Sequence, residues 1–448
     1  MKKTVTILIF ILSGFKTFSQ LQPIGDQNYS FSVADCITYA YEHQNAVVNA
    51  NLDIKSAEYR VKETIGIGLP QINGSATFTD YLRLPVTLIP GEFIGQPGTF
   101  IPLKFGVNYN ANVGVNGSQL LFSGSYLIGL KAAKTYKELS YRNYTRTKID
   151  ANVNVTKAYY QVLVSNEQIR LLDANINQLK QQLDQTVAQN KQGFVEKIDV
   201  DRITVQYNNL VTTRENTIRL LALNYQLLKF QMSMPIEDNL TLTTKLADVA
   251  LDNNVAAITT DTAFYHNRIE YGLQETQKRL YALDVKNRQS QYLPSLSANA
   301  SLASAYQNNR FGQLFNSYFP SSYIGLTLNV PVFNGFQRLN QIRQAKITYT
   351  QSQNNLTELK NSLNLQASQA SITFINGLQT LNNQKNSRVL AEEVLRVSKI
   401  KYQQGVGSSI EVTQAQTDLE NADNQYIQGL YDALVSKVDL DRAYGRIK

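Results

Sequence analysis

Two long segments of the chain, residues 103–234 and 332–448, contain none of its 10 prolines. Proline is the strongest helix breaker, so each segment can hold uninterrupted helices. Residues 130–192 also lack glycine, and one helix over this range would be about 95 Å long. Apolar residues in it recur at the three- and four-residue spacing of a coiled-coil seam, at Ile169, Leu172, Ile176, Leu179 and Leu183. The sequence therefore predicts an elongated protein rich in coiled coil.

The same order of features occurs twice. Leu69-Pro70 and Leu293-Pro294 each end a helical stretch, and Gln192-Gly193 and Gln404-Gly405 each precede a helix start. These pairs lie 224 and 212 residues apart, which indicates a duplicated unit with pseudo-symmetry. We divide the chain into a signal peptide, a first repeat, a linker and a second repeat, at residues 1–19, 20–234, 235–259 and 260–448.

Helix lengths predict how each repeat packs. In each one, two short helices placed end to end match one long helix at 1.5 Å per residue. In the first repeat the short helices are 32–67 and 199–232. In the second repeat the long helix is 336–404, and the short ones are 260–290 and 409–444. Ser32 and Asp35 have the spacing of a helix capping box.

Strand patterns lie between the helices. Residues 105–116 alternate between apolar and small polar side chains, and similar alternation occurs near 72–78, 296–302 and 324–330. Such strands suit a transmembrane barrel, with polar residues toward a wet lumen, but a soluble sheet with one solvated face has the same pattern. Four strands cannot close a barrel, and an open edge is forbidden in lipid, so insertion would require several chains to share one barrel.

Composition excludes several classes of function. With 1 Cys and 2 His, no zinc cluster or His-based catalytic site is expected. Lys2 and Lys3 precede an apolar run typical of a secretory signal, and Cys36 is expected to be a buried free thiol. The formal net charge is +8, but the basic residues are interleaved with acidic ones and form no stripe for nucleic acid. We expect no enzyme, cofactor or metal site.

The chain resembles the TolC-type outer-membrane efflux proteins. The resemblance rests on the duplicated frame, the two Leu-Pro segments and the paired turns at residues 192–200 and 402–412. It implies an α+β membrane protein: a homotrimer whose chains each give four strands to a 12-stranded transmembrane β-barrel, continued by a periplasmic α-helical coiled-coil barrel. It also implies the outer membrane of a Gram-negative bacterium as location. Loops at 82–104 and 307–321 are expected beyond the strands.

The resemblance further implies a passive duct for drugs, small molecules or proteins, in a tripartite efflux or type I secretion system. The partners implied are a periplasmic adaptor and an inner-membrane pump, driven by protons or by ATP. The cargo is not identified. The rival hypothesis is a soluble periplasmic coiled-coil scaffold or adaptor, because coiled-coil seams and a signal peptide fit both classes.

Two residues match the family's closed-tip contacts, Asp199 and Tyr402. The family's basic residue at the second turn is replaced here by Gly407, so the resting aperture is either looser than in the family or held by other residues. Asp199 also suits a helix N-terminus for electrostatic reasons alone. Glycines at the turns are first of all turn formers. The turn residues implied to meet the adaptor are Gly193, Phe194, Val195, Gly405, Val406, Gly407 and Ser408.

Overall fold

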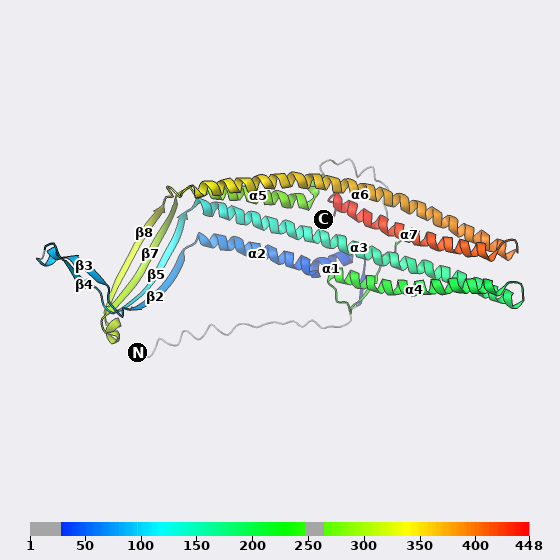
Figure 1. Cartoon of the computed structure of the whole chain (residues 1–448), viewed down its shortest axis with the longest axis horizontal. Helices are drawn as coiled ribbons and strands as arrows, with labels where there is room; N and C mark the ends of the chain where they lie inside the picture. Colours follow the sequence, from blue (N-terminus) through cyan, green and yellow to red (C-terminus); the bar gives the residue numbers. More distant parts are fainter. Residues whose placement is uncertain (1–27, 96, 247–248, 250–263, 448) are drawn as a thin grey trace.

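The computed structural model of the chain describes residues 28–95, 97–246, 249 and 264–447. The expected signal peptide, residues 1–19, lies outside the described residues, as does much of the expected linker. A four-stranded sheet forms one end of the molecule, and a layer of long helices extends from it to hairpin turns at the other end (Figure 1). No described helix is both long enough and apolar enough to cross a membrane.

The first repeat is built on one very long helix, α3 (Gly124–Lys191), of 68 residues. Two shorter helices, α2 (Asn45–Ile67) and α4 (Lys197–Met232), follow one another along it (Figure 1). The coiled-coil seam predicted on α3 packs against α4, in a cluster that contains Leu179 and Leu210. The end-to-end arrangement predicted from helix lengths is therefore present.

The expected helix over 32–67 is wrong in one respect, because the structure divides it at Gln44. The ψ angle of Gln44 is 121°, which is extended, so α1 (Val33–His43) ends there and α2 begins at Asn45. The break lets α1 bury Cys36 and Ala40 completely, in a core that includes Tyr159 of α3. Cys36 is a buried free thiol, as expected. The capping box at Ser32 and Asp35 is also confirmed.

The second repeat copies this plan. Its long helix α6 (Gln337–Gln403) has 67 residues and packs against α5 (Ile269–Ser290) and α7 (Ser409–Ala443). A short parallel pair, β1 (Asn28–Phe31) with β6 (Asn239–Leu242), covers the core of the first repeat where α1 and α4 meet. At mid-length the first repeat thus has an additional apolar layer, and the described part of the second repeat contains no matching strand pair.

Four antiparallel strands form the sheet. They are β2 (Gln71–Asp80), β5 (Tyr109–Phe122), β7 (Ser295–Asn308) and β8 (Tyr318–Asn329), in the order β2-β5-β7-β8. The predicted alternation is present, although β5 starts and ends later than residues 105–116. Within the single chain, the outer edges of β2 and β8 have no partner strand among the described residues.

The register brings the apolar residues of all four strands to one face. Paired residues of antiparallel strands share a face, and the pairs Ala76–Val113, Val115–Leu302 and Ala298–Leu326 are all apolar. The opposite face is polar, and there Ser301 Oγ lies 2.7 Å from Asn116 Oδ1. One side of the sheet thus suits lipid and the other suits water.

The expected loop at 82–104 is instead largely a hairpin, made by β3 (Val86–Pro90) and β4 (Phe100–Lys104). Prolines 85, 90, 97 and 102 favoured a loop because proline cannot donate to a strand ladder. A two-stranded hairpin tolerates Pro90 and Pro102, because both of its strands are edges and half of their N–H groups face outward. This hairpin extends away from the main sheet (Figure 1).

Candidate functional site

The two helical hairpins end in turns with the same backbone geometry. Gly193 follows α3 at a φ of 79°, and Gly405 follows α6 at a φ of 73°. In both turns the next residue donates its N–H to a carbonyl in the last helical turn, 3.0 Å from Phe194 to Gln189 and 3.0 Å from Val406 to Lys401. Only glycine adopts this φ at little cost, so the duplicated glycines have a structural reason.

The residue after each glycine is an exposed apolar side chain. Phe194 is 82% exposed and Val406 is 79% exposed, each at the extreme end of its hairpin. Beyond them the chain is held in place: Asn190 Nδ2 donates to the carbonyl of Val195 at 2.8 Å, and Ser408 Oγ caps α7 by accepting from the amide of Glu411 at 3.2 Å. Each tip thus presents an apolar residue on a rigid turn.

Gly407 has a structural reason to lack a side chain. Its amide donates to the carbonyl of Lys401 at 3.1 Å, which brings its Cα against the end of α6. A Cβ placed there would lie 3.0 Å from Lys401 Cβ and 3.1 Å from the amide nitrogen of Tyr402. A basic residue at this position would therefore require the turn to shift.

Another contact joins the two hairpins. The hydroxyl of Ser409, at the start of α7, donates a short hydrogen bond to the carboxylate of Asp199 in the first turn of α4. Asp199 is only 17% exposed, and Arg202 approaches it at 3.7 Å. The role of Ser409 was not predicted from the sequence. No sequence signal indicates that it contacts Asp199, which lies 210 positions earlier in the chain.

A second contact between the hairpins lies further from the tip. The Gln206 amide on α4 donates to the carbonyl of Thr413 at 3.2 Å and to the Thr417 hydroxyl at 3.3 Å. Asp199 and Gln206 are two helical turns apart on α4, so both face α7. The hairpins are held together by side chains that could separate without disturbing either helix pair.

Tyr402 lies near Asp199 but does not bond to it. Its hydroxyl is buried and has no hydrogen-bond partner among the described residues. Burial raises the pKa of the Tyr402 phenol, and the Asp199 carboxylate raises it further. Tyr402 borders a cavity of about 190 Å³ between α3 and α6, lined mostly by glutamines. Lys399 lines it too, and burial lowers the pKa of this lysine to about 8.

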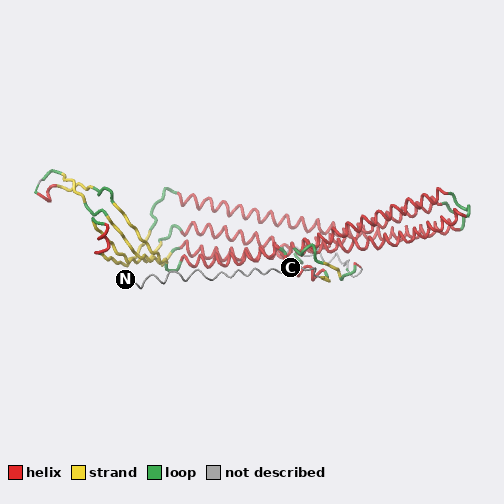
Figure 2. The backbone as a smooth tube through the Cα atoms, turned by 90° about the horizontal axis from the view of Figure 1, so that it is seen from below, coloured by secondary structure: helices red, strands yellow, loops and turns green. Residues whose placement is uncertain are grey.

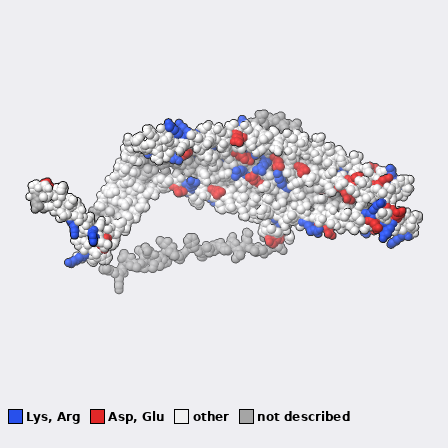
Figure 3. All heavy atoms as spheres, in the orientation of Figure 1, with Lys and Arg blue, Asp and Glu red and all other residues white. Residues whose placement is uncertain are grey.

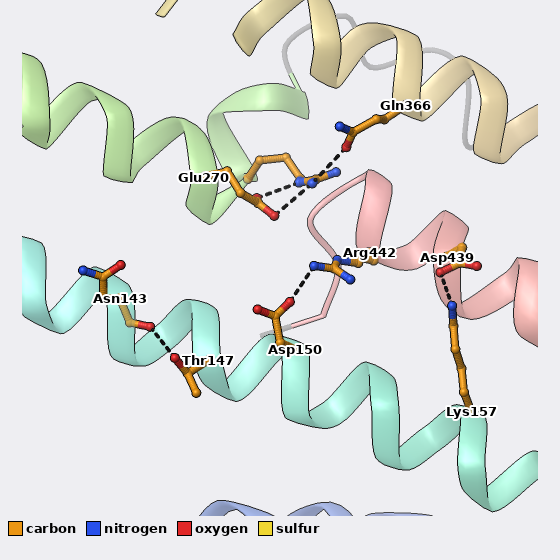
Figure 4. A network of polar contacts seen from close by, with 9 residues as sticks. Asn143, Thr147, Asp150, Lys157, Glu270, Gln366, Asp439 and Arg442 are labelled. Atoms are coloured by element: carbon orange, nitrogen blue, oxygen red, sulfur yellow. Dashed lines mark hydrogen bonds and ion pairs between the residues drawn. The ribbon is translucent and has the colours of Figure 1, made fainter. Parts of the chain in front are cut away.

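Ion pairs connect the repeats at mid-length (Figure 4). Lys157 of α3 lies 2.6 Å from Asp439 of α7, and Arg442 near the end of α7 lies 2.5 Å from Asp150 of α3. Arg268, which is 6% exposed, is held by Glu270 at 2.9 Å. Its charge is compensated, as buried charges must be. The two ion pairs between α3 and α7 fix these helices on one another at mid-length, away from the tip.

The chemistry of the tip follows from the side chains that gather there. In the described part of the chain, no three His, Cys, Asp or Glu side chains are grouped closely enough to hold a metal ion. The groups gathered at the tip are the Asp199 carboxylate, the Arg202 guanidinium, hydroxyls, amides and the Lys399 ammonium, near the ends of long helices. What they can do is hold two hairpins together or release them.

The chain combines a sheet that has one apolar face with two long helical hairpins, which are hydrogen-bonded to each other at their tips. This combination is typical of a class of outer-membrane transport protein. The family model described as outer membrane efflux protein matches residues 37–222 and 273–446, so the chain belongs to that family. It is accordingly a transport protein of the outer membrane and an exit duct for efflux, not an enzyme.

Known proteins agree with this assignment. The outer membrane protein TolC of Salmonella enteritidis is 23% identical over 482 residues, covering 100% of this chain and 87% of that protein. A crystal structure of CusC superposes with a TM-score of 0.75 at 16% identity, covering 95% of both chains. The outer membrane protein VceC of Vibrio cholerae has a TM-score of 0.71 at 14% identity, covering 92% of this chain and 96% of that one.

Proposed function

We propose that three copies of this chain form one continuous duct, with a shared β-barrel in the outer membrane and a helical barrel across the periplasm. The observation that carries this proposal is the sheet register, which gives four strands a common apolar face, together with the outer edges of β2 and β8, which pair with no strand in the described part of the chain. Lipid does not tolerate open edges, and pairing β2 of one copy with β8 of the next removes all of them. Three copies supply 12 strands.

The periplasmic tip is the gate of this duct in our proposal. The bond from Ser409 to Asp199 and the contacts of Gln206 tie the inner ends of the two hairpins together. Asp199 is the constriction residue, and Tyr402 closes the adjacent space with its buried ring. Ser409 takes the place of the basic residue that Gly407 excludes. Conduction is passive, and energy comes from the inner-membrane pump.

The exposed turns are the docking surface for the periplasmic adaptor. Phe194 and Val406 expose apolar side chains that would be covered on binding, and Gly193, Val195, Gly405, Gly407 and Ser408 shape the two turns around them. The pump behind the adaptor is driven by protons or by ATP, and a type I secretion system would use the same duct. Family membership leaves the soluble scaffold hypothesis without support.

The assembly is tested by the mass of the native particle. Protein extracted from outer membranes in detergent is measured by size-exclusion chromatography with multi-angle light scattering. We expect three chains per particle, resistant to mild heating in SDS. A monomer or dimer with an intact far-UV spectrum would contradict the proposed barrel, because one or two copies supply four or eight strands and not 12.

A further inference from the structure

The two connections at the end of the sheet away from the helices differ in how they pack. The β7–β8 connection folds back on the sheet: Leu314, in the short helix η5 (Phe311–Asn316), is 1% exposed, and the Phe311 ring packs on Phe78 and Tyr109. The β2–β5 connection projects as the β3–β4 hairpin. Within the described residues, β3 and β4 pair only with each other.

The β3–β4 hairpin is apolar on both sides. Leu88 and Phe100 point to one face and are 62% and 71% exposed, while Ile89, Ile101 and Leu103 occupy the other face. Residues 82–106 contain only three charged side chains, and the projecting hairpin is mostly uncharged on the surface that Figure 3 shows. An isolated two-stranded hairpin is barely stable in water, so this one needs a partner that covers it.

The direction of the hairpin is set at its base. The Tyr81 amide donates to the carbonyl of Asn108 at 2.8 Å, and the Asn108 amide donates to Asn309 Oδ1 at 3.2 Å. Gly106 then takes a φ of 104°, which turns the chain away from the line of β5. In Figure 2 the hairpin lies toward the same side of the molecule as the helical turns at the other end.

In the duct proposed above, this shared side indicates where the hairpin lies relative to the barrel axis. A gate at the helical turns requires these turns to lie near the axis of the proposed duct, so a hairpin directed to the same side reaches over the mouth of the barrel and not into lipid. A 12-stranded barrel with a strand spacing of about 4.8 Å and a tilt of about 40° has a radius of about 12 Å. The five-residue strands of the hairpin are about 17 Å long, which is enough to reach the axis.

We propose that the three β3–β4 hairpins of the trimer pack against one another over the outer mouth of the duct and form an apolar cap. This inference rests on the trimeric duct of the preceding section. The covering partner is the same hairpin in the other two copies, which explains why both faces are apolar. The duct then has a second closure at its outer end, and cargo leaves by parting three hairpins whose described strands form no ladder with the strands of the barrel wall.

Cysteine cross-linking tests the packing. Leu88→Cys places a thiol on the hairpin, and Ile324→Cys, at an 87% exposed position on the apolar face of β8, is the matched control. The native Cys36 is buried and does not interfere. After oxidation of intact outer membranes, we expect covalent dimers from Leu88→Cys and none from Ile324→Cys. Absence of cross-linked Leu88→Cys in a particle that light scattering shows to be trimeric overturns the cap.

Access to the lumen tests the closure without depending on the tip. Asn112 lies on the polar face of β5, and Asn112→Cys reports how fast a bulky, impermeant maleimide enters from outside the cell. Adding Leu88→Asp and Phe100→Asp should raise the labelling rate several-fold. An unchanged rate overturns the cap, as does quenching of a fluorophore at Leu88→Cys by spin-labelled lipid. A native particle that is not trimeric would instead contradict the proposed duct, and this result is distinguishable from failure of the cap alone.

Discussion

Asn175 on α3 donates a hydrogen bond of 2.8 Å to the carboxylate of Asp423 on α7, and both side chains are buried. Arg388 of α6 donates to the same carboxylate at 2.6 Å. Three helices from the two repeats therefore meet at one acid. A buried carboxylate whose charge is compensated by Arg388 and which also accepts from the Asn175 amide fixes the position of α7 relative to α3, because sliding by one residue would leave all three groups unpaired.

Replacing that acid should destabilise the helical layer. Asp423→Leu leaves the Arg388 guanidinium and the Asn175 amide without their partner, and we expect a loss of about 2 kcal/mol in the free energy of unfolding. Asp432→Asn, at an exposed position on the same helix, is the control and should change little. Thermal unfolding followed by circular dichroism measures both. Equal melting temperatures for the two variants would contradict the role of the buried network.

The tip should close more firmly as the pH rises through about 8, the pKa to which burial lowers Lys399. Burial penalises the charged lysine, so closing the tip has its full cost below about pH 8, where Lys399 is charged whether the tip is closed or open. This cost decreases as the pH rises from about 8 to the ordinary value of 10.5, above which the lysine is neutral in both states. Conductance in planar bilayers should therefore be unchanged below about pH 8 and fall as the pH rises from about 8 to 10.5.

Lys399→Met should remove this pH dependence and give low conductance throughout. Lys401→Met, at an exposed neighbouring position, should keep it. A pH profile that is identical in the wild type and Lys399→Met would show that the step belongs to another group.

The exposed turn residues should be required for efflux and not for the pore. Phe194→Asp and Val406→Asp place a charge where the adaptor's surface would cover an apolar side chain, and we expect efflux in cells to fall at least tenfold. Trimer mass and conductance should not change, because neither side chain packs within the chain. Phe194→Leu should restore most of the efflux. Normal efflux by both aspartate variants would contradict docking at the turns.

Cys36 should be unreactive in the folded protein. Its side chain is 0% exposed, and burial raises the pKa of the thiol to about 12, so almost no thiolate exists at pH 8. We expect no reaction with an aromatic disulfide reagent over an hour in detergent, and one thiol per chain at once after denaturation. Rapid labelling of the native protein would mean that the core between α1 and α3 opens.

Much of the fold could be predicted from the sequence. The long helices follow from the placement of proline and glycine, and the strands follow from alternation, because both signals are local. The break at Gln44 could not be predicted, since its cause is the burial of Cys36 and Ala40 against α3. The β3–β4 hairpin was hidden by Pro90 and Pro102, which a hairpin with two free edges accommodates.

The site was predicted less completely, for a related reason. Gly193 and Gly405 could be recognised because each turn needs a positive φ. Asp199 could be identified from the family resemblance, but its partner Ser409 could not. The contact between them depends on how two hairpins from different repeats pack together. The reason for a glycine at position 407 is also visible only in the three-dimensional structure, where the end of α6 leaves little room for a Cβ.

The central claim is that contacts between the hairpins close a conducting duct. The most direct measurement is the single-channel conductance of native trimers in planar bilayers, compared with Asp199→Ala, Ser409→Ala and Tyr402→Phe. Glu411→Gln, whose side chain lies in the same turn of α7 as Ser409, is the control. We expect low conductance in the native protein and the control, and several-fold higher conductance in Asp199→Ala and Ser409→Ala. Native trimers that conduct fully, with no change in any variant, would contradict a gate at this tip.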